Sequence, residues 1–329
     1  MKKWCKRIAL STVALVLLVL TVAFSYEQIS RVVADKSFSP EGELLDVGGH
    51  SLHLLRKGNM GPTVVFESGL DGFGHLSWYK VEAEVSRFAT TVSYDRAGIL
   101  WSERGNAPKT AAAMGKDLST LLERGGFNKP YILVGHSLAG IILRPFIAKN
   151  ARDIGGVVLV DASHPDQFNR FPSEMNQTPA RWAMNLIASF GLMRLTAPST
   201  FPNSNTEDRI NTAGIALIHI SANAVFDELR NIQSLAEEAN AITSFGNIPV
   251  VVITGASPTR NDTTPSEFRE DMARIWTELQ TDLLTLSTDS QQILAMESGH
   301  YVQVDQPEIV IAAIRELVER TENVALRIE

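Results

Sequence analysis

A serine, a histidine and several aspartates of this chain occur in patterns that could support nucleophilic catalysis. The segment Tyr131–Gly140 is a short apolar run that ends in Gly-His-Ser and continues into small, helix-compatible residues. This pattern is typical of a nucleophile elbow, a tight strand-to-helix turn that holds the hydroxyl of a serine, here Ser137, clear of the backbone. Small residues must flank the serine because the turn is strained and the following helix packs closely against the strand.

A serine hydroxyl is a poor nucleophile unless a base removes its proton. We predict that His300 is this base, because it follows a late predicted strand and precedes the terminal helix. The base needs a carboxylate that orients it and stabilises its charged form. Asp161 ends a predicted strand, whereas Asp262 follows a longer loop, so the position of Asp161 is better defined. We therefore favour Asp161, with Asp262 and Asp166 as alternatives.

The anionic intermediate of such a reaction needs backbone N–H donors. We expect one donor at Leu138, at the start of the helix after the elbow, and a second at Leu70, in the glycine-rich segment Ser68–Gly74. Glycines allow the backbone to approach closely there. The same segment lacks the lysine and the spacing of a phosphate-binding loop. The sequence shows no metal-ligand cluster and no cofactor motif, so we predict neither a metal nor a cofactor.

Strand and helix signals alternate along the chain from Leu44 onward. Such alternation predicts an α/β fold with a mostly parallel central sheet and helices on both faces. Helical runs interrupt the alternation at about residues 164–244, and we interpret them as a cap over the carboxyl edge of the sheet. Besides the elbow strand and its helix, the predicted strands are Leu44–Val47, Ser51–Leu55, Thr63–Glu67, Thr90–Tyr94, Gly156–Val160, Pro249–Thr254 and Gln292–Met296, and the predicted helices are Trp78–Phe88, Thr110–Arg124 and Glu308–Thr321.

Taken together, these residues resemble the α/β-hydrolase superfamily over roughly residues 44–324. The order Ser, Asp, His along the chain is the order of that superfamily. The segment Asp95–Ser102 is similar to its Asp-Arg-x-Gly-x-Gly-x-Ser turn, with Leu100 in place of the second glycine. Ser68-Gly69 stands where many members have His-Gly, and Ala139 replaces the last glycine of Gly-x-Ser-x-Gly. Alanine is still small, so we expect the elbow to form.

The resemblance also bears on the acid and on the cellular location. In the superfamily the acid generally follows the strand that corresponds to Pro249–Thr254, and in some members it lies at the place of Asp161, so the resemblance leaves this choice open. The runs Leu-Val-Asp-Ala-Ser-His-Pro-Asp and Ser-Gly-His-Tyr-Val-Gln resemble a bacterial subgroup that is often membrane-anchored.

The N-terminal segment has the pattern of a signal or an anchor. Four basic residues precede the uncharged run Ile8–Phe24. We predict a signal anchor over residues 1–25, a linker over 26–43 and the hydrolase domain over 44–329. The basic flank places the catalytic domain outside the cytoplasm, bound to the membrane through the N-terminal helix. Cleavage at the weak site Ala23-Phe24-Ser25 would instead give a secreted protein.

The predicted chemistry is that of a serine hydrolase acting on a small-molecule ester, amide or thioester. An acyltransferase would use the same residues with an alcohol or amine as acceptor, and a non-catalytic ligand-binding protein could keep the same fold. The net charge of −7 argues against nucleic acid as a partner. An apolar group in the cap suggests a hydrophobic acyl or alcohol moiety in the substrate: Trp182, Met184, Leu186, Phe190, Leu192, Met193 and Leu195.

Overall fold

The computed structural model describes residues 2–106, 108–172, 180–196, 205–258 and 264–325. The chain divides into two compact units. The larger unit contains residues 41–177 and 223–329, and the smaller unit contains residues 1–40 and 178–222. The candidate catalytic residues Ser137, Asp161 and His300 all belong to the larger unit.

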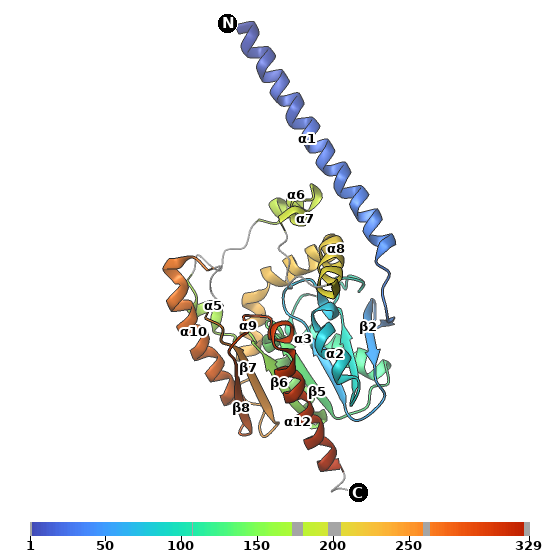
Figure 1. The fold of residues 1–329 in the computed structure, drawn as a ribbon, viewed down its shortest axis with the longest axis vertical. Helices are drawn as coiled ribbons and strands as arrows, with labels where there is room; N and C mark the ends of the chain where they lie inside the picture. The colour runs from blue at the N-terminus through green and yellow to red at the C-terminus, as the bar shows by residue number, and fades with distance from the viewer. Residues whose placement is uncertain (1, 107, 173–179, 197–204, 259–263, 326–329) are drawn as a thin grey trace. The chain divides into compact units, whose positions relative to one another are not determined.

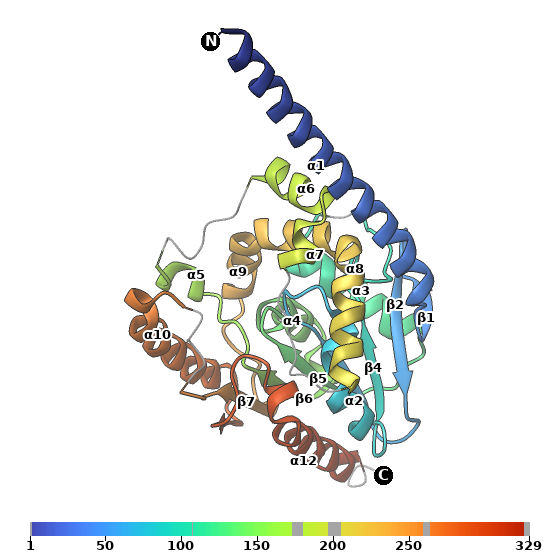
Figure 2. The same ribbon diagram turned by 45° about the horizontal axis from the view of Figure 1, so that its top comes forward.

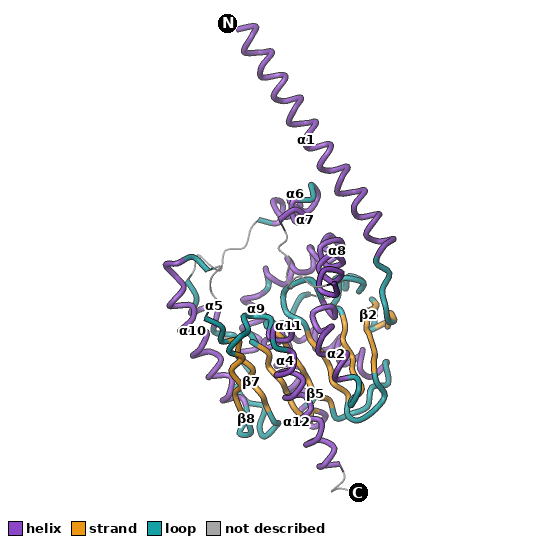
Figure 3. Tube along the Cα trace, viewed as in Figure 1, coloured by secondary structure: helices purple, strands orange, loops and turns teal. Residues whose placement is uncertain are grey.

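The larger unit is built on one eight-stranded sheet with the order β1-β2-β4-β3-β5-β6-β7-β8. The six strands from β4 to β8 in this order run parallel, whereas β2 is antiparallel to both β1 and β4. Figure 3 shows these strands in orange with purple helices around them. The strands are β1 (Glu43–Asp46), β2 (Ser51–Lys57), β3 (Thr63–Glu67), β4 (Thr90–Tyr94), β5 (Tyr131–His136), β6 (Ile154–Val160), β7 (Val250–Gly255) and β8 (Ser290–Ala295).

Both faces of the sheet are covered, and this explains the continuous apolar runs of its central strands. Alternate residues of β5 enter different cores, with Leu133 on one face and Ile132 and Val134 on the other. The first core includes side chains of α3 (Ala111–Arg124) and α4 (Ala139–Lys149). The second includes side chains of α2 (Tyr79–Val85) and α12 (Pro307–Ala325), which Figure 1 shows beside each other.

The connection from β6 to β7 contains the described helices α5 to α9, which Figure 2 shows in green to orange. This confirms the predicted helical insertion, which lies between β6 and β7 along the chain. Helix α10 (Arg269–Asp282) follows β7, and the sequence analysis did not identify it. The inserted helices are α5 (Gln167–Arg170), α6 (Arg181–Ser189), α7 (Leu192–Thr196), α8 (Asn205–Arg230) and α9 (Ile232–Asn240).

The smaller unit contains α1 (Lys2–Ser37), α6, α7 and the first part of α8. Helix α1 continues through residues that the sequence analysis assigned to a linker. Within the described residues, α1 is the one helix that is long and apolar enough to cross a membrane, by length and composition alone. Its most apolar window is not buried by any other part of the structure.

Candidate active site

Ser137 lies on the sharp turn between β5 and α4. Its φ angle is 52°, in the left-handed region that is strained for a residue with a side chain. Two backbone hydrogen bonds hold this conformation: the N–H of Ser137 donates to the carbonyl of Val160 (3.2 Å), and the N–H of Ser163 donates to the carbonyl of Ser137 (2.7 Å). The predicted elbow therefore forms, and it is held by hydrogen bonds to the end of strand β6 and to the segment that follows it.

The turn requires small neighbours, as the sequence pattern predicted. A Cβ on Gly135 would lie 2.9 Å from the Cβ of Ala139, and a Cβ on Gly140 would lie 2.6 Å from the carbonyl oxygen of Ser163. Both separations are too short for real atoms, so the helix can pass this close to the strand only with glycine at these positions. Ala139 itself is buried and is accommodated at the last position of the motif.

His300 lies in the loop after β8, and its imidazole ring is placed between the serine and an aspartate. Its Nε2 is 2.9 Å from the Oγ of Ser137, and its Nδ1 is 2.6 Å from the Oδ2 of Asp161. The short helix α11 (Val302–Asp305) supports the loop, because Asp305 accepts a hydrogen bond from the N–H of Gly299 (3.1 Å). The ring is about one-third exposed, so a substrate can reach it.

Asp161 follows β6 directly and is completely buried. Its Oδ1 accepts hydrogen bonds from the backbone N–H of Gly255 and from the indole N–H of Trp276, both at 3.0 Å. These two donors leave Oδ2 directed at His300 and stabilise the charged carboxylate in a buried place. Trp276 comes from α10, so the sequence analysis missed this contribution together with the helix that carries it.

The two alternative acids are placed differently. Asp166 is turned toward Asn240, whose side-chain amide donates to its Oδ1 at 3.2 Å. Asp262 lies outside the described residues. Among the described carboxylates, Asp161 is the one within hydrogen-bonding distance of the His300 ring.

The two predicted oxyanion donors come from segments next to Ser137. Leu138 begins α4, and Leu70 belongs to the loop after β3. Within the described residues, neither backbone N–H has a hydrogen-bond acceptor, which is what a site for an anionic oxygen requires. The loop approaches the serine closely, since a Cβ on Gly69 would lie 2.9 Å from the Cβ of Ser137.

Arg96 holds the loop after β3, which carries the predicted oxyanion donor Leu70. Its guanidinium donates to the carbonyl oxygens of Ser68 (2.7 Å) and Gly69 (2.8 Å). It also forms ion pairs with Glu67 (2.6 Å) and with Glu228 (2.7 Å), at the end of α8. All three charged side chains are buried, and burial raises the pKa of Glu67 against the opposing effect of Arg96. The sequence identified the motif that contains Arg96, but it gave no sign of the contact with Glu228.

His136 precedes Ser137 and contacts His300. Its Nε2 donates to the backbone carbonyl of His300 (2.9 Å), and the two imidazole rings have centroids 4.6 Å apart. His136 therefore packs against the loop that carries His300.

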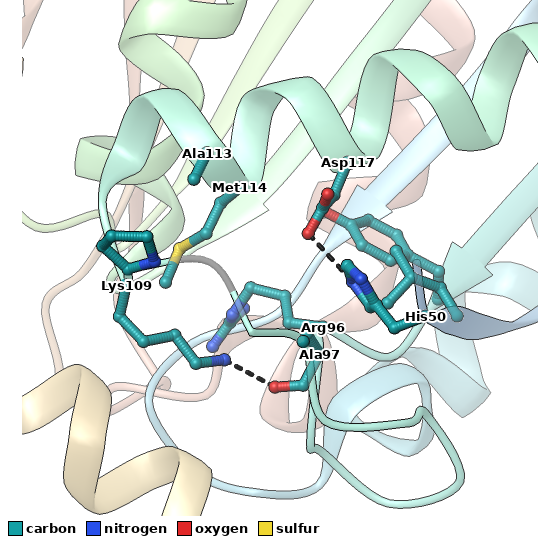
Figure 4. A pocket seen from close by; sticks show the side chains of 11 residues that line it. His50, Arg96, Ala97, Lys109, Ala113, Met114 and Asp117 are labelled. Atoms are coloured by element: carbon teal, nitrogen blue, oxygen red, sulfur yellow. Dashed lines mark hydrogen bonds and ion pairs between the residues drawn. The ribbon is translucent and has the colours of Figure 1, made fainter. Parts of the chain in front are cut away.

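Arg96 also lines a pocket of the larger unit, which Figure 4 shows from close by. His50 and Asp117 lie together in its lining, with Nε2 and Oδ2 3.2 Å apart, and Lys109 donates to the carbonyl of Ala97 (2.5 Å). Burial lowers the pKa of Lys109. Ser137 and His300 are not among the residues that line this pocket.

Three buried side chains have the composition of a metal site. The potential ligand atoms of His53, His75 and Asp95 lie within 4.8 Å of one another. However, the two Nδ1 atoms are 2.8 and 2.9 Å from the Asp95 oxygens, which are hydrogen-bond distances. Both carboxylate oxygens are thereby satisfied by the protein itself, so this cluster acts as a structural tie between β2, β4 and the helical turn after β3.

The fold and the elbow define a class of protein, and the comparisons with known proteins agree. A family model described as the alpha/beta hydrolase family matches residues 64–313. The chain therefore belongs to this family.

Several relatives and solved structures are similar to this chain. The uncharacterized Bacillus subtilis protein YqjL is 28% identical over 267 residues, covering 80% of this chain and 86% of YqjL. A Gibberella zeae AB hydrolase superfamily protein is 25% identical and covers 74% of this chain and 82% of itself. A Thermogutta terrifontis esterase structure superposes with a TM-score of 0.61 at 20% identity, over 83% of this chain and 94% of the esterase. The epoxide hydrolase CorEH gives a TM-score of 0.62 at 16% identity, over 84% of this chain and 98% of CorEH.

Proposed function

We propose that this protein is a serine hydrolase that cleaves an ester, amide or thioester through an acyl-enzyme on Ser137. The observation that carries the proposal is the position of the His300 ring, with Nε2 at 2.9 Å from the Ser137 hydroxyl and Nδ1 at 2.6 Å from Asp161. A nucleophile, a base and a carboxylate in this sequence of contacts form a catalytic triad.

In the proposed reaction, His300 Nε2 takes the hydroxyl proton while Ser137 Oγ attacks the carbonyl carbon of the substrate. The Leu70 and Leu138 N–H groups stabilise the resulting anionic oxygen. The tetrahedral intermediate collapses as His300 returns the proton to the leaving group, and the acyl group remains on Ser137. Water, deprotonated by His300, then releases the acid and restores the serine. Asp161 keeps Nδ1 protonated throughout and stabilises the imidazolium.

The nature of the elbow residue separates this proposal from other chemistries of the fold. Structural neighbours include an epoxide hydrolase as well as an esterase, and likeness at this level of identity shows the fold alone. A serine with an adjacent imidazole supports acyl transfer. Epoxide opening in this fold is associated with an aspartate as the nucleophile at the elbow. An acyltransferase would use the same groups with an alcohol or amine in place of water, and a binding protein would need none of them.

Covalent labelling tests the nucleophile directly. We expect a fluorophosphonate probe to label the wild-type protein and not the Ser137→Ala variant, because the probe traps an activated serine. Ser163→Ala, which changes a nearby serine hydroxyl, is the control and should still be labelled. Label that persists in Ser137→Ala would contradict the assignment, and absence of label in the wild type would favour a binding protein.

We further propose that α1 anchors the protein in a membrane, with the hydrolase unit outside the cytoplasm. Basic residues before Ile8 and the uncharged run that follows support this orientation. The test is fractionation followed by protease treatment of intact cells or spheroplasts. We expect the hydrolase unit to sediment with membranes and to be digested from outside. Protein found in the soluble cytoplasmic fraction would contradict the anchor.

A further inference from the structure

Two short helices of the smaller unit carry large apolar side chains that are exposed. Trp182 and Leu186, four residues apart on α6, are 69% and 49% exposed. Leu192 and Leu195, three residues apart on α7, are 46% and 70% exposed. These spacings place each pair on one face of its helix. The sequence analysis associated these residues with a substrate pocket, but their exposure favours a role at a surface.

Specific contacts attach this helix pair to α1. The rings of Phe190 and Phe24 are in edge-to-face contact, with centroids 6.2 Å apart. The guanidinium of Arg31 donates to the carbonyl of Ala188 (2.9 Å), and that of Arg194 donates to Glu27 (3.0 Å). Phe24, Glu27 and Arg31 are spaced by three and four residues, so they form one face of α1.

The contact between the helix pair and α1 is closely packed and includes a buried, hydrogen-bonded carboxylate. Glu27 is only 1% exposed and receives hydrogen bonds from both Arg31 and Arg194. Gly191, between the two helices, has φ 72°, and a Cβ there would lie 3.0 Å from a carboxylate oxygen of Glu27. The level of α6 and α7 along α1 is therefore fixed by this face of α1.

That level coincides with the end of the apolar run. After Arg7, Glu27 is the first charged residue of the chain, one helical turn beyond Phe24. If α1 crosses a bilayer with Ile8–Phe24 in the hydrocarbon, its contacts with α6 and α7 begin at the lipid headgroups. Tryptophan and amphipathic helices with arginine are favoured at this depth. Residues 180–196 contain two arginines and no acidic residue. Arg194 pairs with Glu27, and Arg181 is exposed.

We propose that α6 and α7 form a membrane-surface element, and that Trp182, Leu186, Leu192 and Leu195 insert among the lipids of the leaflet from which α1 emerges. The inference rests on the proposed anchor. Lipid is the occupant because continuity with the membrane-spanning helix brings the bilayer surface to these side chains. Insertion is favourable because it removes the exposed apolar surface of these four side chains from water.

Spin labelling of the full-length protein in nanodiscs tests this. Cys5 is the only cysteine, so a Cys5→Ser background allows one label at a time. The test site is Leu186→Cys (49% exposed), the positive control for the anchor is Val16→Cys (51%), and the aqueous control in the larger unit is Met60→Cys (48%). The three sites are equally exposed in the protein, so oxygen and a water-soluble nickel chelate report only what surrounds each label.

We expect labels at residues 16 and 186 to favour collisions with oxygen, with residue 186 at the shallower depth, and the label at residue 60 to favour the chelate. A lipid-like signal at residue 16 with an aqueous signal at residue 186 would overturn the inference and leave the anchor intact. Immobilisation of label 186 without oxygen access would overturn it in favour of a protein partner or a second copy. An aqueous signal at residue 16 would refute the anchor and, with it, the inference.

A second measurement uses the fluorescence of the native tryptophans and replaces one indole at a time with phenylalanine. In nanodiscs made with brominated lipids, we expect Trp182→Phe to lose a quenched component of tryptophan fluorescence, and Trp4→Phe to lose another. Loss with Trp4→Phe alone would contradict the lipid contact of α6. Because both residues are exposed, neither substitution should disturb folding, which circular dichroism can verify.

Discussion

At the scale of single residues, the two oxygens of Asp161 have different partners. Oδ1 is satisfied by Gly255 and Trp276, and Oδ2 is directed at His300. A carboxylate at the end of a strand can be held in this way because its backbone is already fixed by the sheet. The sequence supported Asp161 by this argument, and the structure adds donors that no local pattern could have indicated.

Exchange of the acid is the first test at this scale. We expect Asp161→Asn to lower kcat on the order of 10³–10⁴-fold, because asparagine cannot stabilise the imidazolium and favours the wrong tautomer of His300. Asp262→Asn should change kcat little. Steady-state kinetics with a p-nitrophenyl ester gives both values. The opposite ranking would transfer the acid role to Asp262.

The indole of Trp276 provides a second test. We expect Trp276→Phe to lower kcat about 10-fold, because one hydrogen bond to a buried carboxylate is lost while most of the ring packing remains. Trp4→Phe, at an exposed tryptophan of α1, is the matched control. The pH–rate profile separates positioning from general destabilisation. In Trp276→Phe we expect the acidic limb of the profile to move toward higher pH, whereas general destabilisation would lower the rate without moving this limb. An unchanged profile with full kcat would show that Gly255 alone suffices.

At the scale of elements, Arg96 connects the end of α8 to the loop after β3, which carries the proposed oxyanion donor Leu70. Its two carbonyl contacts hold Ser68 and Gly69, and Glu228 at the end of α8 holds the guanidinium in turn. A substitution at Glu228 should therefore alter the position of the Leu70 backbone N–H, although Glu228 is remote from Leu70 in the sequence.

We expect Glu228→Gln to lower kcat about 3- to 30-fold with little change in KM, because the loop is less well positioned for the transition state. The free energy of unfolding should fall by about 1–3 kcal/mol, since a charged hydrogen-bonded pair becomes a neutral one. Glu238→Gln on α9, whose carboxylate accepts a hydrogen bond from the exposed N–H of Ala112, is the matched control. A rise in KM at constant kcat would argue against loop positioning.

The tie between β2 and β4 makes stability depend on pH. His53 Nε2 faces the carbonyl of Glu41 (2.5 Å) and Nδ1 faces the Asp95 carboxylate (2.8 Å), so both ring nitrogens face acceptors and the site favours the imidazolium form. Burial opposes this charge, but the Asp95 contact raises the pKa of His53 above 6.5 overall. The His53 and His75 contacts outweigh burial and lower the pKa of Asp95 to about 2, so it stays charged across this range.

A raised pKa of His53 in the folded state stabilises the fold fully below 6.5, and this contribution disappears as the pH rises through the folded-state value. We therefore expect the difference in free energy of unfolding between the wild type and His53→Gln to shrink as the pH increases from 6 upward. Denaturant titrations at several pH values measure it. A difference that stays constant with pH would mean that His53 is neutral in the folded protein.

At the scale of the whole molecule, the central parallel strands β3, β5, β6 and β7 were predictable because each is a largely apolar, buried run bounded by turn residues. Helix α10 was not, because its sequence Arg269–Asp282 is mostly polar and buries only a narrow stripe. The same contrast holds for the site: Ser137 and His300 follow from local patterns, whereas Trp276 and Glu228 reach the site through tertiary packing. Likewise, the apolar residues of α6 and α7 were visible in the sequence, but whether they face inward or outward depends on contacts with α1.

The strand order also has a consequence for how the protein becomes active during synthesis. Ser137 and Asp161 belong to neighbouring strands of one continuous strand–helix–strand segment, which can form early as the chain emerges. His300 follows β8, which lies at the edge of the described sheet and pairs with β7. A chain that stops before this loop therefore holds Ser137 without its proposed base. Under the proposed function, hydrolytic activity would begin only after the chain has been synthesised beyond β8 and the loop that carries His300.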